Sequence, residues 1–114
     1  MAVITLWHNP RCSKSRAALA LIDASEHEPN VRLYLTKPPS PREIRAVLAK
    51  LRKPASAIVR RSEPAFADLG LAEADDEALI AAMADHPILI ERPIAISGRR
   101  ARVGRPPERV EDLF

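Results

Sequence analysis

The first 36 residues follow the order strand, helix, strand, and this order limits the possible folds more than any other feature. Residues 2–7, AVITLW, are rich in β-branched side chains and run into the turn signal of residues 8–10, HNP. Residues 13–26 place apolar side chains on one helical face, and residues 30–36, NVRLYLT, alternate in the period of a strand. Because a crossover helix joins parallel strands, this region predicts a parallel pair.

The middle of the chain reads as a series of helices. Ser40 is the expected N-cap of the clearest one, with Pro41 at the first helical position and Glu43 completing a capping box. Its apolar stripe comprises Ile44, Val47, Leu48 and Leu51, and Pro54 ends it. Short helical pieces are expected over residues 55–61 and 64–72, and a further helix over residues 75–87.

The last quarter predicts a hairpin and a closing helix. Residues 93–104 read as two short strands around a turn at Gly98, and residues 106–114 read as a helix. A hairpin is antiparallel, so the complete sheet should be small and mixed, with helices flanking it. The expected fold class is therefore α/β, matching a thioredoxin-like fold with a helical insertion. No repeat, low-complexity tract or linker divides residues 1–114, so we expect one domain.

Composition excludes several classes of protein. The chain has 114 residues, of which 46% are hydrophobic and 29% charged, as expected of a soluble folded domain. Its 18 basic and 15 acidic residues leave a net charge of +3, too small a surplus to predict nucleic-acid binding. Apolar runs are far below membrane-spanning length, and the N-terminus lacks the features of a signal peptide, so we expect no membrane association.

The chain has a single cysteine, Cys12, which cannot form an internal disulfide. No cluster of cysteine and histidine has the spacing of a zinc site, so no metal is expected. A lone thiol fits a reducing compartment, which predicts a cytoplasmic location.

Cys12 lies just before an expected helix, where unpaired N–H groups favour a thiolate or a bound oxyanion. An ordinary thiol with a pKa of ~8.5 is only about 3% ionised at neutral pH, and a majority of thiolate needs about 2.7 kcal/mol. A helix terminus supplies ~0.3–1 kcal/mol, so other groups must contribute. The local candidates are His8, Arg11, Lys14 and Arg16. A small buried cysteine beside a solvated basic face is the alternative, but NPRCSKS is a poor sequence for a buried apolar site.

The segment ERPIAI, residues 91–96, begins an expected strand with a proline, which belongs at an edge, bulge or turn. In thioredoxin-like folds a cis-proline at this point of the topology faces the active cysteine. Pro93 would be that residue, and Arg92 would then reach the thiol. The alternative is a surface arginine before a proline, and the pattern alone does not decide between them.

Five motifs together resemble the glutaredoxin-coupled arsenate reductase family, in family order from Ile4 to Val110: HNPRCSKSR, LYLTKPPS, IVRRSEP, HPILIERPIAI and RVGRPPE. The resemblance implies a thioredoxin-like fold with Cys12 as the nucleophile and His8 helping to lower its pKa. It also implies three arginines that bind the oxyanion and stabilise the thiolate. These match Arg60, Arg92 and Arg105; the secondary candidates near Cys12 are Asn9, Arg11, Lys14 and Arg16.

The resemblance further implies that the Cys12 thiolate attacks arsenate and that glutathione attacks the adduct to release arsenite, a reaction of arsenical resistance. No cofactor would be bound, glutathione would be a co-substrate, and glutaredoxin would be the partner. A phosphatase-like C-x5-R enzyme disagrees with the C-x3-R spacing from Cys12 to Arg16 and with the single cysteine. Two alternatives stay open: a thiol oxidoreductase with another substrate, and a redox regulator that binds RNA polymerase.

Overall fold

The computed structural model describes residues 3–114, which form two compact units. The sheet unit joins the N-terminal segment up to Lys37 with Arg92–Phe114, and the helical unit is Pro38–Glu91. The organisation of residues 1–114 as one domain stays a prediction.

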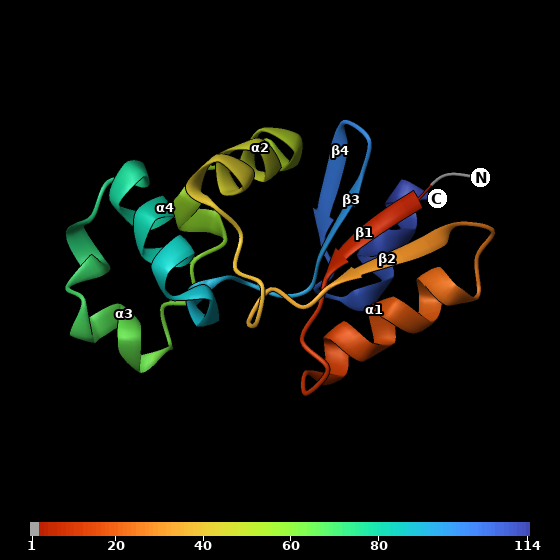
Figure 1. Cartoon of the computed structure of the whole chain (residues 1–114), viewed down its shortest axis with the longest axis horizontal. Helices are drawn as coiled ribbons and strands as arrows, with labels where there is room; N and C mark the ends of the chain where they lie inside the picture. Colours follow the sequence, from red (N-terminus) through yellow and green to blue (C-terminus); the bar gives the residue numbers. More distant parts are fainter. Residues whose placement is uncertain (1–2) are drawn as a thin grey trace. The chain divides into compact units, whose positions relative to one another are not determined.

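The sheet unit is built on four strands in the order β2-β1-β3-β4 (Figure 1). β1 pairs with β2 in parallel and with β3 antiparallel, and β3 and β4 form an antiparallel hairpin. Gly98 lies in the hairpin turn with a φ of 57°, a left-handed conformation that favours glycine. The expected mixed sheet and α/β class are therefore confirmed. The elements are β1 (Val3–Trp7), α1 (Ser13–Asp23), β2 (Glu28–Arg32), β3 (Ile94–Ser97), β4 (Arg100–Val103) and the 3₁₀-helix η4 (Pro107–Leu113).

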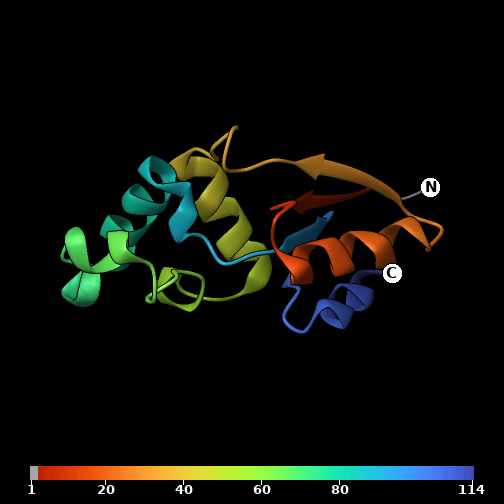
Figure 2. The same ribbon diagram turned by 90° about the horizontal axis from the view of Figure 1, so that it is seen from below.

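The helices α1 and η4 lie side by side against one face of this sheet (Figure 2). The α1 side chains Ala18 and Ile22, one turn apart, are fully buried there. They share a core with residues from β1, β3 and η4: Ile4, Leu6, Ala95, Val110 and Leu113. Burial of this apolar surface stabilises the packing of the two helices on the sheet. That packing fixes the strand and helix ends that carry the site.

The second strand is displaced from the prediction. It runs over Glu28–Arg32 instead of residues 30–36, and the amides of Thr36 and Lys37 donate to the Leu33 carbonyl in a turn. The alternation of residues 30–36 resembled a half-buried strand, but β2 is an edge strand held by main-chain pairing with β1. Consequently Leu33 and Leu35 are exposed in the loop that follows.

Other boundaries differ less. The first expected helix ends at Asp23, and the closing helix is the 3₁₀-helix η4, which starts with a proline. Residues 55–61 contain only one 3₁₀ turn before Val59 forms an isolated bridge to Ile90. The start of the expected first strand, Ala2, lies outside the described residues.

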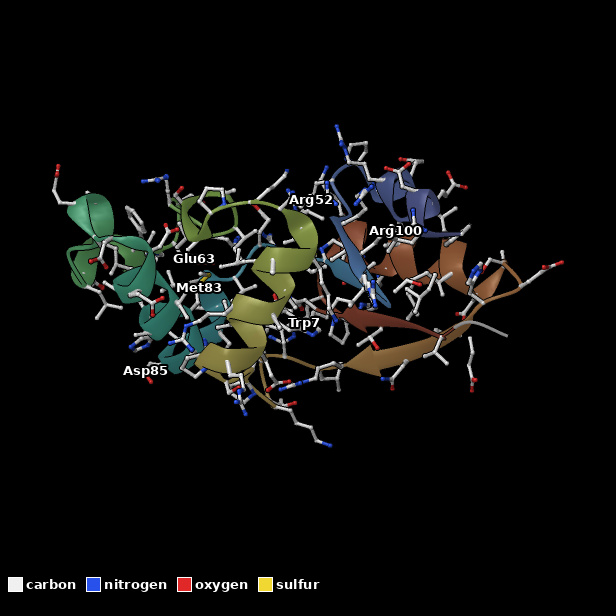
Figure 3. All side chains as sticks on the ribbon, turned by 90° about the horizontal axis from the view of Figure 1, so that it is seen from above. Trp7, Arg52, Glu63, Met83, Asp85 and Arg100 are labelled. Carbon is white, nitrogen blue, oxygen red and sulfur yellow. The ribbon has the colours of Figure 1, made fainter. Side chains whose placement is uncertain are left out.

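The helical unit confirms the predicted capping box. The Glu43 amide donates to Ser40 Oγ at 3.1 Å, and the Ser40 amide donates to Glu43 Oε1 at 3.0 Å. The predicted stripe of α2 is buried, and α2 contacts α4, where Met83 points inward and is fully buried while Asp85 is exposed (Figure 3). The unit comprises α2 (Pro41–Leu51), η1 (Ala55–Ala57), α3 (Pro64–Asp68), η2 (Leu71–Glu73), α4 (Asp76–Asp85) and η3 (Pro87–Leu89).

Within residues 3–114, no helix combines the length and the hydropathy needed to cross a membrane.

Candidate functional site

Cys12 is the N-cap of α1 and has an extended backbone. Its amide donates to the Asn9 carbonyl at 3.0 Å, and its own carbonyl accepts from the Arg16 amide at 3.0 Å as the helix begins. Upstream, the His8 amide donates to the Arg32 carbonyl at 2.8 Å, which anchors the loop to β2. These bonds place the partly exposed thiol over the free N–H groups of the first helical turn.

The pKa of the Cys12 thiol is lowered overall. Burial raises it, and the backbone N–H groups of Ser15 and Lys14 together with the Arg92 guanidinium lower it by more. Both amides belong to the first turn of α1, whose unpaired N–H groups stabilise a negative charge. Arg92 contributes both its charge and a side-chain hydrogen bond to the sulfur. The site thus favours a thiolate beside a fixed cation.

Arg92 lies just before β3, and contacts with the residues that follow β4 fix its position. The peptide bonds before Pro93 and Pro106 are both cis. The Gly104 amide donates to the Pro93 carbonyl at 2.9 Å, and Arg105 Nη1 donates to the Arg92 carbonyl at 3.2 Å. The structure therefore brings Arg92 and Arg105 together on the sheet unit that carries Cys12. Their roles in binding an oxyanion stay predictions.

His8 faces Ser15, a residue that the sequence analysis did not select. His8 Nδ1 lies 2.6 Å from Ser15 Oγ, which also accepts from the Asn9 amide at 3.0 Å. The pKa of His8 is lowered, first by burial and then by the charge of Arg16, so the ring is neutral near pH 7. Since a neutral imidazole has one protonated nitrogen, the direction of this hydrogen bond is set by whichever ring nitrogen carries the proton.

This arrangement changes what His8 can contribute. A neutral ring supplies no positive charge, and the groups that lower the pKa of Cys12 are the two amides and Arg92. The role of His8 in thiol activation stays a prediction. Ser15 could have been selected from the sequence, because it lies three residues after Cys12. At that position of a helix, the backbone amide faces the N-cap side chain.

Two of the secondary candidates, Asn9 and Arg11, lie in the loop before Cys12, and the other two, Lys14 and Arg16, lie in the first turn of α1. Arg16 Nη1 donates to the Pro10 carbonyl at 2.8 Å, and the Arg11 amide donates to Asn9 Oδ1 at 3.0 Å. The side chains of Arg11 and Lys14 are exposed. Arg16 and Asn9 therefore have structural tasks in the loop, whereas Arg11 and Lys14 present charge to solvent.

Arg60 belongs to the helical unit, so its part in the site stays a prediction. Its Nη1 lies 2.7 Å from Glu63 Oε1 and 3.4 Å from the Ile88 carbonyl, and its side chain is mostly buried. The neighbouring Arg61 instead lies over the Phe66 ring, 5.3 Å from its centroid. The ion pair gives Arg60 a fixed position within its own unit.

A pocket of about 310 Å³ opens beside the Cys12 loop. One wall is formed by the loop itself and the other by the loop that follows β2. The lining residues are His8, Asn9, Pro10, Arg11, Leu33, Leu35 and Thr36. Within residues 3–114, no group of three or more histidine, cysteine or acidic side chains is arranged to hold a metal ion.

Comparison with known proteins gives consistent matches over the whole chain. Residues 7–113 match the ArsC family. An arsenate reductase from Neisseria meningitidis serogroup A is 42% identical over 117 positions, covering 100% of both chains. The Escherichia coli K12 protein YfgD, described as uncharacterized, is 42% identical over 113 residues, 96% of this chain and 95% of its own.

A solved structure gives the same result. The arsenate reductase from Vibrio cholerae superposes with a TM-score of 0.94 at 40% identity, covering 99% of this chain and 98% of that chain. These matches confirm the thioredoxin-like fold class and the resemblance to the arsenate reductase family, whereas its glutaredoxin-coupled subtype stays a prediction.

Proposed function

This chain belongs to the ArsC family, and on that premise we propose that it is an arsenate reductase in which Cys12 is the nucleophile. The observation that carries the proposal is the Cys12 thiol at the start of α1, with two backbone amides and the Arg92 guanidinium favouring its ionised form. Amides and a guanidinium around a thiolate are also suitable donors for a tetrahedral oxyanion. Arg105, hydrogen-bonded to the Arg92 carbonyl, supplies a second guanidinium.

The proposed reaction begins with attack of the Cys12 thiolate on arsenic. A sulfur–arsenic bond forms, and one arsenate oxygen leaves as water after taking up protons. Glutathione then attacks the adduct through its own sulfur. The two sulfurs together supply two electrons to As(V), which leaves as As(III) while a disulfide forms between Cys12 and glutathione. In total, one arsenate and two thiols give one arsenite, one disulfide and one water.

The need for external thiols follows from the cysteine content. Cys12 is the only cysteine in the sequence, so no internal thiol can resolve the adduct or the mixed disulfide. We propose glutathione as the second thiol and glutaredoxin as the protein that removes glutathione from Cys12. A chain that works through one free thiol suits a reducing compartment, which supports a cytoplasmic location.

The proposal is tested by arsenate-dependent oxidation of NADPH in the presence of glutathione, glutaredoxin and glutathione reductase. The parent protein should show turnover, and Cys12→Ser should fold normally and show none. Turnover that persists in Cys12→Ser would contradict the mechanism. A parent with an acidic thiol and no turnover would instead favour a thiol oxidoreductase with another substrate.

A further inference from the structure

We propose that the pocket beside the Cys12 loop binds glutathione, the small anionic peptide thiol that the proposed reaction consumes. This inference rests on the proposed function, because that reaction requires a second thiol to reach arsenic on Cys12. The pocket is lined by His8–Arg11, the four residues that directly precede Cys12, and by Leu33, Leu35 and Thr36. Its volume of about 310 Å³ is at the lower end of the range for small-molecule sites.

The charge around the pocket favours an anionic ligand. Within the sheet unit, residues 3–22 and 29–37 form or flank its two walls, and neither segment contains an aspartate or a glutamate. The same segments carry five basic residues: Arg11, Lys14, Arg16, Arg32 and Lys37. Arg11 lines the pocket with an exposed side chain and forms no ion pair within residues 3–114. A peptide with two carboxylates and one ammonium group, as in glutathione, complements this charge.

The second wall presents an ordered apolar surface. Leu33 and Leu35 are 41% and 39% exposed, although they are large hydrophobic side chains. Their loop is held by the Leu33 carbonyl, which accepts from the Thr36 amide at 3.1 Å, the Lys37 amide at 2.9 Å and the Thr36 hydroxyl at 3.1 Å. Because these bonds fix the loop before a ligand arrives, binding loses little loop entropy. The leucines can cover the methylene groups of the peptide while Arg11 meets a carboxylate.

The position of the pocket suits the chemistry. A three-residue peptide spans at most roughly 10 Å, so a ligand seated on residues 8–11 keeps its central thiol within reach of the next residue, Cys12. There its sulfur attacks the arsenic of the adduct, which leads to the two-electron step described above. Holding the second thiol beside the adduct replaces a collision from solution by a positioned attack.

The experiment uses S-methylglutathione, which retains both carboxylates but has no free thiol. Binding to the full-length reduced protein is followed by calorimetry and by amide chemical shifts in nuclear magnetic resonance. We expect saturable binding that weakens as salt concentration rises, with the largest shifts in residues 8–11 and 33–36. Because the probe cannot reduce arsenate, this measurement does not depend on turnover.

Three variants test the charge and the location. Leu35→Glu places a carboxylate in the pocket and should weaken binding of S-methylglutathione by roughly tenfold, whereas Leu35→Lys should not weaken it. Val31→Glu makes the same charge change at a residue that is 42% exposed on β2 and does not line the pocket, so it should leave binding near the parent value. In the coupled assay, Leu35→Glu should raise the KM for glutathione and leave the KM for arsenate unchanged.

The outcomes separate this proposal from the proposed function. Turnover of arsenate with no binding of the probe at residues 8–11 and 33–36 would overturn the pocket assignment and leave the reaction intact. Binding there without arsenate turnover would support the pocket and contradict the reaction. If Leu35→Glu raised the KM for glutaredoxin but left glutathione binding unchanged, the pocket would serve a protein partner, and our assignment would be wrong.

Discussion

Gly104 has no room for a side chain, and this makes Gly104→Ala the most direct test of how the site is positioned. A Cβ atom at Gly104 would lie 2.8 Å from Pro93 Cγ and 3.2 Å from Val110 Cγ1. Pro93 and Val110 are buried, and the Gly104 amide donates to the Pro93 carbonyl, so the backbone at Gly104 is held close to the proline. The added methyl group must therefore displace the proline ring, the Val110 side chain or the strand.

The cost of that displacement can be bounded. The backbone of Gly104 is not in the left-handed region, so alanine is acceptable there and the penalty is steric. Overpacking by one methyl group in a packed core costs ~1–3 kcal/mol. With a urea m-value of about 1–3 kcal/mol/M, the unfolding midpoint should fall by roughly 1 M.

A second effect should appear at the thiol. Pro93 follows Arg92, whose guanidinium lowers the pKa of Cys12, so a shift of the proline should move this arginine and raise the pKa of the thiol. Urea unfolding measures the first effect, and thiolate absorbance followed against pH measures the second. Gly98→Ala is the control: Gly98 has a φ of 57° and no atoms near its Cβ position, so alanine should cost about 1–2 kcal/mol of backbone strain without changing the thiol. If Gly104→Ala kept both the parent stability and the parent titration, our account of the Pro93 contact would be wrong.

Three further predictions concern single groups. Arg92→Ala should raise the pKa of Cys12, so its alkylation by iodoacetamide should require higher pH; an unchanged pH profile would contradict the contact. The lowered pKa of His8 means that the folded chain binds this proton less readily than the unfolded chain. Unfolding free energy should therefore fall as pH decreases from the ordinary His value of 6.5 toward the lowered pKa, and His8→Gln should flatten that decline in urea titrations. Ser40→Ala removes the hydroxyl of the α2 capping box and should cost about 1 kcal/mol in urea unfolding; no loss would show that the cap is replaced by water.

Local signals in the sequence predicted much of the fold. The capping box at Ser40 and Glu43 was readable because its partners are three residues apart. The expected order of strands gave the mixed sheet because crossover and hairpin connections fix strand direction. The second strand was misplaced because the alternation of residues 30–36 continues past Arg32, where pairing with β1 ends.

The site was predictable where it depended on the Cys12 loop and less so where it depended on distant contacts. The thiol at the helix start followed from sequence order, and the approach of Arg92 followed only from the topology of the expected fold. Ser15 was missed because a buried hydroxyl that contacts a histidine ring leaves no periodic signal. The close approach of Gly104 to Pro93 joins residues 11 positions apart, and no local pattern reports it.

The most direct test of the central claim is a single turnover without glutaredoxin. Reduced protein, arsenate and glutathione are mixed, arsenite is quantified, and the intact mass of the protein is measured. We predict one arsenite released per chain and one glutathione joined to Cys12 as a disulfide that dithiothreitol removes. Formation of arsenite with Cys12 left unmodified and still alkylatable would contradict the claim that this thiol supplies one of the two reducing sulfurs.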